Sequence, residues 1–231
     1  MPSITVEEND VSVYRYELQD PEHAHKEFKQ HAGDFLTYLK FLVPNKSNIR
    51  MYIQYTTYQM QIVEFVSKVL THIGHKHTPF TKVGVGLFNS SAYNNEKLLE
   101  MLDLYTYVKL DATYLYKSVW GRTYWFFLHF TSLLIKDDKT LIDTFASILL
   151  NFNLALLCGD CSVNYKAKDP LKTLTVRINE TQDPITSLYL FHNIVNTAIH
   201  SHIYPIENFL TMYKLEQHYI KDIAYSVKIN Y

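Results

Sequence analysis

The sequence contains few cysteines and few glycines. Cys158 and Cys161 are the only cysteines in 231 residues, which excludes a framework of structural disulfides and makes a reducing compartment the expected location. Glycine occurs six times, whereas tyrosine occurs 19 times and phenylalanine 13 times. A chain rich in large rings and poor in glycine favours packed helices over sheets with glycine-rich turns. We therefore expect an all-α protein with a sizeable core.

Excess charge, long apolar runs and a leader segment are also missing. The formal net charge is −1 and no long basic run occurs, so we expect no nucleic-acid partner. No uncharged apolar stretch is long enough to span a membrane. The acidic start of the chain lacks the apolar centre of a secretory signal. These absences predict an intracellular protein with no membrane partner.

Apolar residues recur at spacings of three and four through most of the chain, which is the pattern of amphipathic helices. The predicted helices cover roughly residues 21–43, 49–73, 90–107, 112–135, 141–157, 158–168 and 183–202. Gly74 is the expected C-cap of the second helix, and Asp183 with Pro184 has the residue types of a helix start. Residues 1–20 are expected to form an extended arm, and residues 170–182 a loop. The helices divide into two domains, 1–110 and 111–231, of which the second has four helices and a short fifth.

The pair Cys158 and Cys161 has the C-x-x-C spacing, which is compatible with several kinds of site. It can supply half of a zinc site, completed by two of the eleven histidines. It can be a thioredoxin-like motif, although the flanking segments are helical, or a dithiol beside a redox cofactor. It can also be an inert, partly buried pair. Because a helix N-terminus stabilises a thiolate, one of the two sulfurs is expected to have a lowered pKa.

Two further stretches place polar and aromatic residues on apolar helix faces. Trp125 and His129 share a face at i,i+4, and His192 and Asn196 do the same on a later helix. Such groups can simply form an interhelical hydrogen-bond network. Together with Arg122, they also supply the ring, the hydrogen-bonding groups and the cation that suit an aromatic ligand with phosphate groups.

These motifs resemble those of the Erv/ALR family of flavin-linked sulfhydryl oxidases. The pattern is G-R-x-x-W-x-x-L-H at 121–129, C-x-x-C at 158–161 and H-N-x-V-N at 192–196, and the similarity extends over roughly residues 116–204. The resemblance implies a four-helix bundle that binds FAD beside the cysteines. It also implies oxidation of protein dithiols to disulfides with reduction of O2 to hydrogen peroxide.

The resemblance also implies roles for individual residues. Cys161 corresponds to the sulfur beside the flavin, and Cys158 to the sulfur that substrate attacks. The FAD contacts implied by motif position are Arg122, Trp125 and His129 on the first helix, with His192, Asn193 and Asn196 on the adenine and ribose side.

The chain departs from the cellular members of this family. It has neither a second, shuttle C-x-x-C nor the cysteines that staple the fold, and Ser201 stands where the family often has lysine. Arg122, His200 and His202 are then the candidates for phosphate contact. A cysteine-poor oxidase domain after a cofactor-free helical domain resembles the viral, baculovirus-type members. This implies a homodimer located in the host cytoplasm or the virion. The alternative is a helical interaction module stapled by zinc.

Overall fold

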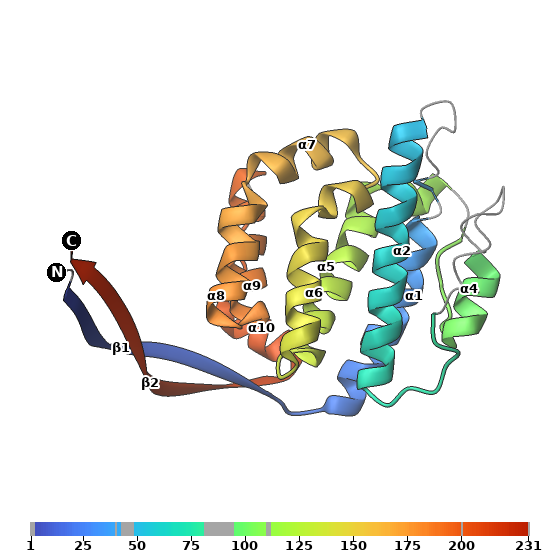
Figure 1. Cartoon of the computed structure of the whole chain (residues 1–231). Coiled ribbons are helices and arrows are strands. Elements are labelled where there is room, and N and C mark those ends of the chain that lie inside the picture. Colours follow the sequence, from blue (N-terminus) through green and yellow to red (C-terminus); the bar gives the residue numbers. More distant parts are fainter. Residues whose placement is uncertain are drawn as a thin grey trace. The chain divides into compact units, whose positions relative to one another are not determined.

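The computed structural model describes residues 3–39, 41–42, 49–80, 95–109, 112–199 and 201–230. The chain divides into two compact units, one made of Met1–Pro21 with Tyr204–Tyr231 and the other of Glu22–Ile203. Figure 1 labels the elements of both units.

The larger unit is helical. Its elements are α1 (Pro21–Leu39), α2 (Ile49–His72), α4 (Asn95–Leu102), η1 (Ala112–Leu115), α5 (Lys117–Leu134), α6 (Lys139–Leu150), η2 (Phe152–Ala155), α7 (Gly159–Ala167), the π-helix η3 (Leu171–Val176), α8 (Arg177–Thr181) and α9 (Pro184–Ala198). The predicted all-α class is therefore confirmed in its coarse form. The finer prediction, an Erv-like four-helix bundle, stays a prediction.

Helix ends with clear sequence signals lie where they were predicted. Gly74 has a φ of 72° after α2, and the N–H of His75 donates to the carbonyl of Leu70 at 2.9 Å, as in a Schellman C-cap. Asp183 caps α9 by accepting the N–H of Thr186 at 2.9 Å. Both contacts satisfy backbone groups that the helix itself leaves without partners.

Three predicted boundaries are wrong. Residues 170–182 are mostly helical, because η3 and α8 occupy them. The helix predicted to end near residue 107 ends at Leu102, where Asp103 adopts a φ of 51°; its predicted start lies outside the described residues. The helix predicted over 141–157 breaks at Asn151 and continues as η2.

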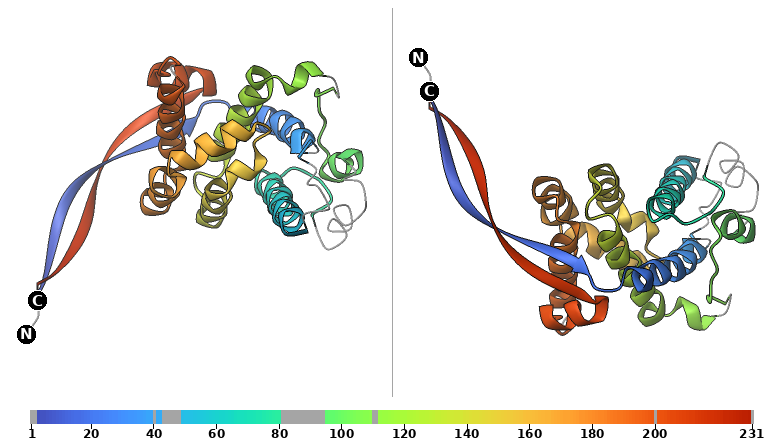
Figure 2. Two further views of the ribbon diagram at one scale, coloured as in Figure 1. Left: turned by 90° about the horizontal axis from the view of Figure 1, so that it is seen from above. Right: turned by 90° about the horizontal axis from the view of Figure 1, so that it is seen from below.

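Helices from the first half of the chain pack on helices from the second half. The rings of Phe35 on α1 and Phe127 on α5 stack with centroids 4.2 Å apart. Phe65 on α2 stacks on Phe145 of α6 at 5.7 Å. Figure 2 shows these helices side by side. Aromatic side chains of the first half therefore pack on the second half. The predicted boundary at 110/111 falls on undescribed residues.

The smaller unit is a two-stranded antiparallel ribbon with one helix, and this sheet was not predicted. Strand β1 (Ser3–Leu18) pairs with β2 (Leu215–Asn230) along its whole length. Helix α10 (Ile206–Tyr213) precedes β2. The Asp20 carboxylate accepts a hydrogen bond from Lys214 Nζ at 2.8 Å at the base of the ribbon. The predicted extended arm is confirmed as β1.

Within the ranges given above, no helix combines the length and the apolar character that crossing a lipid bilayer requires.

Candidate functional site

The two cysteines form a disulfide at the start of α7. Cys158 is the N-cap residue, and its Sγ accepts the N–H of Cys161 at 3.2 Å. The N-terminal end of the helix dipole therefore lies at this sulfur. Reduction of the disulfide would place a thiolate where the unpaired N–H groups of the first turn stabilise it.

Three buried tyrosines hold the backbone that leads to the disulfide. Tyr58 on α2 donates its hydroxyl to the carbonyl of Ile148 at 2.8 Å, and Tyr124 on α5 donates to that of Ala155 at 2.9 Å. Tyr165 on α7 donates to the carbonyl of Leu149. Burial raises the pKa of all three hydroxyls. They therefore remain neutral donors, and they hold the end of α6 and the last residue of η2.

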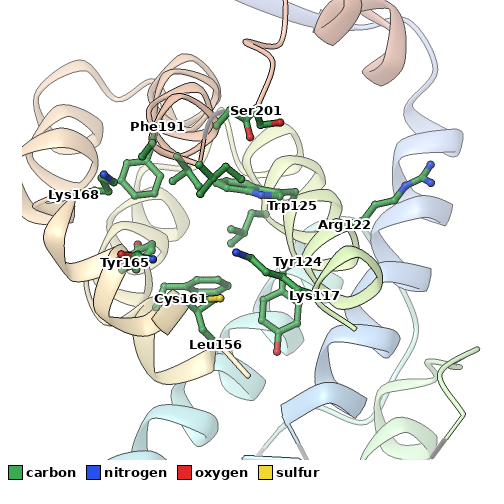
Figure 3. A pocket seen from close by; sticks show the side chains of 18 of the residues that line it. Lys117, Arg122, Tyr124, Trp125, Leu156, Cys161, Tyr165, Lys168, Phe191 and Ser201 are labelled. Atoms are coloured by element: carbon green, nitrogen blue, oxygen red, sulfur yellow. The ribbon is translucent and has the colours of Figure 1, made fainter. Parts of the chain in front are cut away.

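A cavity of about 710 Å³ lies beside the disulfide (Figure 3). Its walls come mainly from α5, α7, η3 and α9. The lining residues are Lys117, Ser118, Trp120, Gly121, Arg122, Tyr124, Trp125, Leu128, Leu149, Phe152, Leu156, Cys161, Asn164, Tyr165, Lys168, Leu174, Leu188, Phe191, Val195, Asn196, Ala198, Ile199 and Ser201. The lining is mostly apolar with a few polar groups, as in sites that take a cofactor or a small molecule.

The predicted site residues meet at this cavity in part. Four of them, Arg122, Trp125, Cys161 and Asn196, line it. Cys158 is joined to Cys161 by the disulfide. His129 and His192 contact the ring of Trp125. Asn193 lines a different groove. The fold thus brings all three motifs together around one cavity, apart from Asn193.

Trp125, His129 and His192 form one stacked, hydrogen-bonded group. The rings of Trp125 and His192 are nearly parallel, 6° apart in plane, with centroids 3.7 Å apart. His129 is only 1% exposed, and its Nε2 lies 3.0 Å from His192 Nδ1. Burial lowers the pKa of His192 to about 4. Burial, and then the charge of His192, lowers that of His129 well below its usual value. Both imidazoles are therefore neutral at physiological pH.

The cations around the cavity differ from those predicted. The side chain of Arg122 points away from the cavity in Figure 3, and its guanidinium carbon lies 5.2 Å from the centre of the Phe126 ring. His202 is exposed and does not line the cavity, and His200 lies outside the described residues. Lys117 and Lys168 line it instead. Within the described ranges neither lysine is in an ion pair, so both are available to an anionic ligand.

Sequence reasoning missed both lysines, because each resembles an ordinary solvated lysine. Lys117 is the first residue of α5, and Lys168 is the C-cap of α7. They are far apart in the sequence, and only the fold brings them to one cavity. No local signal in the sequence distinguishes them from the other lysines.

A FAD molecule suits the chemistry of these residues. The parallel rings of Trp125 and His192 offer an aromatic surface, Asn196 offers a carboxamide, and Lys117 and Lys168 offer positive charge for phosphate groups. The volume lies within the range of about 300–1,000 Å³ typical of such pockets. Cys161 stands at the cavity wall, where a redox cofactor has to meet a dithiol.

The zinc alternative requires two further ligands beside the cysteines. Among the residues whose positions are described, no group of three or more histidine, cysteine, aspartate or glutamate side chains is arranged to hold a metal ion. The histidine pair closest to the cavity is engaged with itself and with Trp125.

Comparison with known proteins does not identify a family for this chain. No family model, no curated protein and no solved structure matches this chain. The functional conclusion consequently depends on the motifs and on the cavity that they surround.

Proposed function

We propose that this protein is a flavin-linked thiol oxidase that introduces disulfide bonds into protein substrates. The reaction converts two thiols and one O2 to one disulfide and one hydrogen peroxide. The observation that carries this proposal is the position of Cys161, which lines a cavity suited to an aromatic, phosphate-bearing cofactor while it is bonded to Cys158.

The two cysteines have different positions, which suggests different roles. Cys158 does not line the cavity, so a substrate thiolate would attack its sulfur, form a mixed disulfide and release Cys161 as a thiolate. A second substrate thiolate then attacks the substrate sulfur of the mixed disulfide and releases Cys158. The product is a substrate disulfide, and the enzyme holds two reduced cysteines.

FAD, when bound, accepts two electrons from the reduced cysteines and passes them to O2. The residues that would hold it are Trp125, Asn196, Lys117 and Lys168, with His192 and His129 fixing the plane of the Trp125 ring. Burial keeps both imidazoles neutral, so they stack beside the Trp125 ring without placing a charge there.

The first test is the visible absorption of the purified full-length protein. A yellow protein with stoichiometric, non-covalent FAD supports the proposal, whereas a colourless protein with stoichiometric zinc supports the interaction module. Oxygen consumption with dithiothreitol then measures the activity. Asn196→Ala should lower FAD occupancy, and Asn179→Ala on the exposed surface of α8 is the matched control.

Single cysteine variants test the assignment of the two sulfurs. Cys161→Ser should abolish oxygen consumption with dithiothreitol and retain FAD, because the sulfur is not among the groups that hold the cofactor. Cys158→Ser leaves Cys161 as a thiolate at the cavity, so a long-wavelength thiolate-to-flavin absorption band is expected in this variant alone. The same band in Cys161→Ser would reverse the two roles.

A further inference from the structure

A second, open groove adjoins the cofactor cavity. It has a volume of about 960 Å³ and lies among the C-terminal end of α7, the segment formed by η3 and α8, and one side of α9. Lys168 and Ala198 line both the groove and the cavity. The groove is therefore next to the proposed site, although neither Cys158 nor Cys161 lines it.

One wall of the groove is positively charged. Lys168, Lys172 and Arg177 line it, against a single acidic residue, Glu180. Lys172 has only a long, exposed contact of 3.9 Å with Asp169, which contributes little. In the part of the chain that is described, Lys168 and Arg177 are in no ion pair. Because Lys168 is also assigned to the cofactor phosphates, Lys172 and Arg177 supply the positive charge of this wall, against Glu180.

The other side of the groove is apolar and accessible. Leu190, Ile194 and Ala198 follow one another at i,i+4 along α9, so they form one line on that helix. Leu190 is 36% exposed and Ile194 39%. A line of exposed aliphatic side chains opposite a row of cations matches a polypeptide with both an apolar side chain and acidic residues.

We infer that this groove binds an acidic segment of the protein substrate, with an apolar side chain against Leu190 and Ile194. The inference rests on the proposed function for the identity of the bound chain, and it names the substrate class as acidic polypeptides. The positive wall attracts their carboxylates, and the apolar side chain of the segment is buried against Leu190 and Ile194. Small thiols such as dithiothreitol bypass the groove.

The length of α7 gives the distance between the groove and the reactive sulfur. Ten residue steps separate Cys158 from Lys168, which is about 15 Å at ~1.5 Å per helical residue. An extended chain covers that distance in roughly four to five residues. The acidic segment should therefore lie about that far from the reactive cysteine in the substrate sequence.

A direct binding measurement tests the groove independently of catalysis. The probe is a fluorescent, cysteine-free peptide with one leucine among glutamates, and fluorescence anisotropy reports its binding to the full-length protein. Lys172→Glu and Arg177→Glu should each weaken binding about fivefold, and the double variant more. Lys166→Glu is the matched control, because it makes the same charge change at an exposed residue of α7 that does not line the groove.

Salt and probe identity give the remaining outcomes. Raising the salt from about 0.1 M to about 1 M shortens the Debye length from about 10 Å to about 3 Å. It should therefore weaken binding of the acidic peptide to the unaltered protein. The inference is overturned if a lysine-for-glutamate peptide binds equally well, or if Lys166→Glu weakens binding as much as Lys172→Glu. It is also overturned if a single-stranded oligonucleotide binds the groove more tightly than the acidic peptide does.

Turnover separates this inference from the proposed function. With a reduced acidic dithiol peptide, Lys172→Glu and Arg177→Glu should lower kcat/KM about fivefold or more and leave dithiothreitol oxidation unchanged. If the unaltered protein oxidises no thiol but still binds the acidic probe through these residues, the oxidase proposal fails and the groove stands. If the unaltered protein oxidises thiols but has no preference for acidic peptides, the oxidase proposal stands and the groove inference fails.

Discussion

At the scale of single residues, the buried histidines His129 and His192 make the stability of the protein depend on pH. Both side chains are neutral in the folded protein, because burial disfavours the charged imidazolium. In the unfolded chain each has an ordinary pKa of 6.5. The unfolded state therefore binds more protons than the folded state below that value, and acid favours unfolding.

We predict that the free energy of unfolding falls as the pH drops from 6.5 to about 4, the interval between the unfolded and folded pKa values of His192. The loss for this residue should be on the order of 1–3 kcal/mol. Urea unfolding at a series of pH values measures it. His192→Phe, which keeps a ring on Trp125 and removes the titration, should flatten the dependence. An unchanged slope in that variant would assign the effect to other histidines.

Helical spacing predicted which of the candidate site residues share a helix face. The i,i+4 spacing indicated that Trp125 shares a helix face with His129, and His192 with Asn196. It did not specify that the two helices meet, which the contact between His129 and His192 shows. Arg122 has the right charge, but its direction depends on the packing of Phe126, which spacing does not specify. Lys117 and Lys168 carry no local signal, since the feature that distinguishes them is a cavity between distant helices.

At the scale of elements, Tyr58 connects the first half of the chain to the disulfide segment. Its hydroxyl donates to a carbonyl in the last turn of α6, one of the groups that a helix leaves without an internal partner. Tyr58→Phe keeps the ring and removes that hydrogen bond. The variant should lose about 1 kcal/mol of stability.

Tyr55→Phe is the control for this variant, since Tyr55 lies one turn earlier on α2 and is half-buried. Guanidinium unfolding compares the two variants with the unaltered protein. Equal stability of both would show that the Tyr58 hydroxyl contributes nothing to holding α6.

At Gly33 the backbone of α1 closely approaches the backbone of Tyr105. A Cβ at this position would lie 1.9 Å from the backbone oxygen of Tyr105. Gly33→Ala should therefore destabilise the protein by about 1–3 kcal/mol, as other overpacked core substitutions do.

Gly121→Ala offers the opposite case, because nothing lies within 4 Å of the added methyl group. It should stabilise the unliganded protein by roughly 0.5–1 kcal/mol through helix propensity. Thermal unfolding measures the expected decrease in stability for Gly33→Ala and the expected increase for Gly121→Ala. Equal shifts in the two variants would contradict the close contact at Gly33.

Helix boundaries were predicted correctly where a capping residue marks the helix end, and wrongly where a residue is compatible with both the end of one helix and the start of the next. Gly74 and Asp183 each specify a helix end by themselves. Pro170 ends one helix but also opens the next, because proline is favoured in a first turn. The apolar spacing of Leu171, Leu174 and Ile178 then fits the helical segments that were predicted as a loop.

At the scale of the whole molecule, the two halves of the larger unit share one core. Removing α1 and α2 would expose Phe127 and Phe145, together with the carbonyl that Tyr58 caps. We predict that residues 111–231 alone are insoluble or incompletely folded and retain little FAD. Sedimentation and flavin content of this fragment and of the full chain test this, and also the predicted homodimer. A soluble, fully flavinated fragment would show that the first half is dispensable.

The register of the ribbon has a consequence for the order of folding. Leu18 pairs with Leu215, and Ser3 pairs with Asn230, so β1 is synthesised well before its partner strand. At about 5–20 residues per second, a nascent β1 waits roughly 10–40 s for β2 to be synthesised. During that time its backbone groups are open to any other extended chain. The ribbon can therefore close only after β2 has been synthesised, and any truncation within β2 leaves part of β1 without its partner strand.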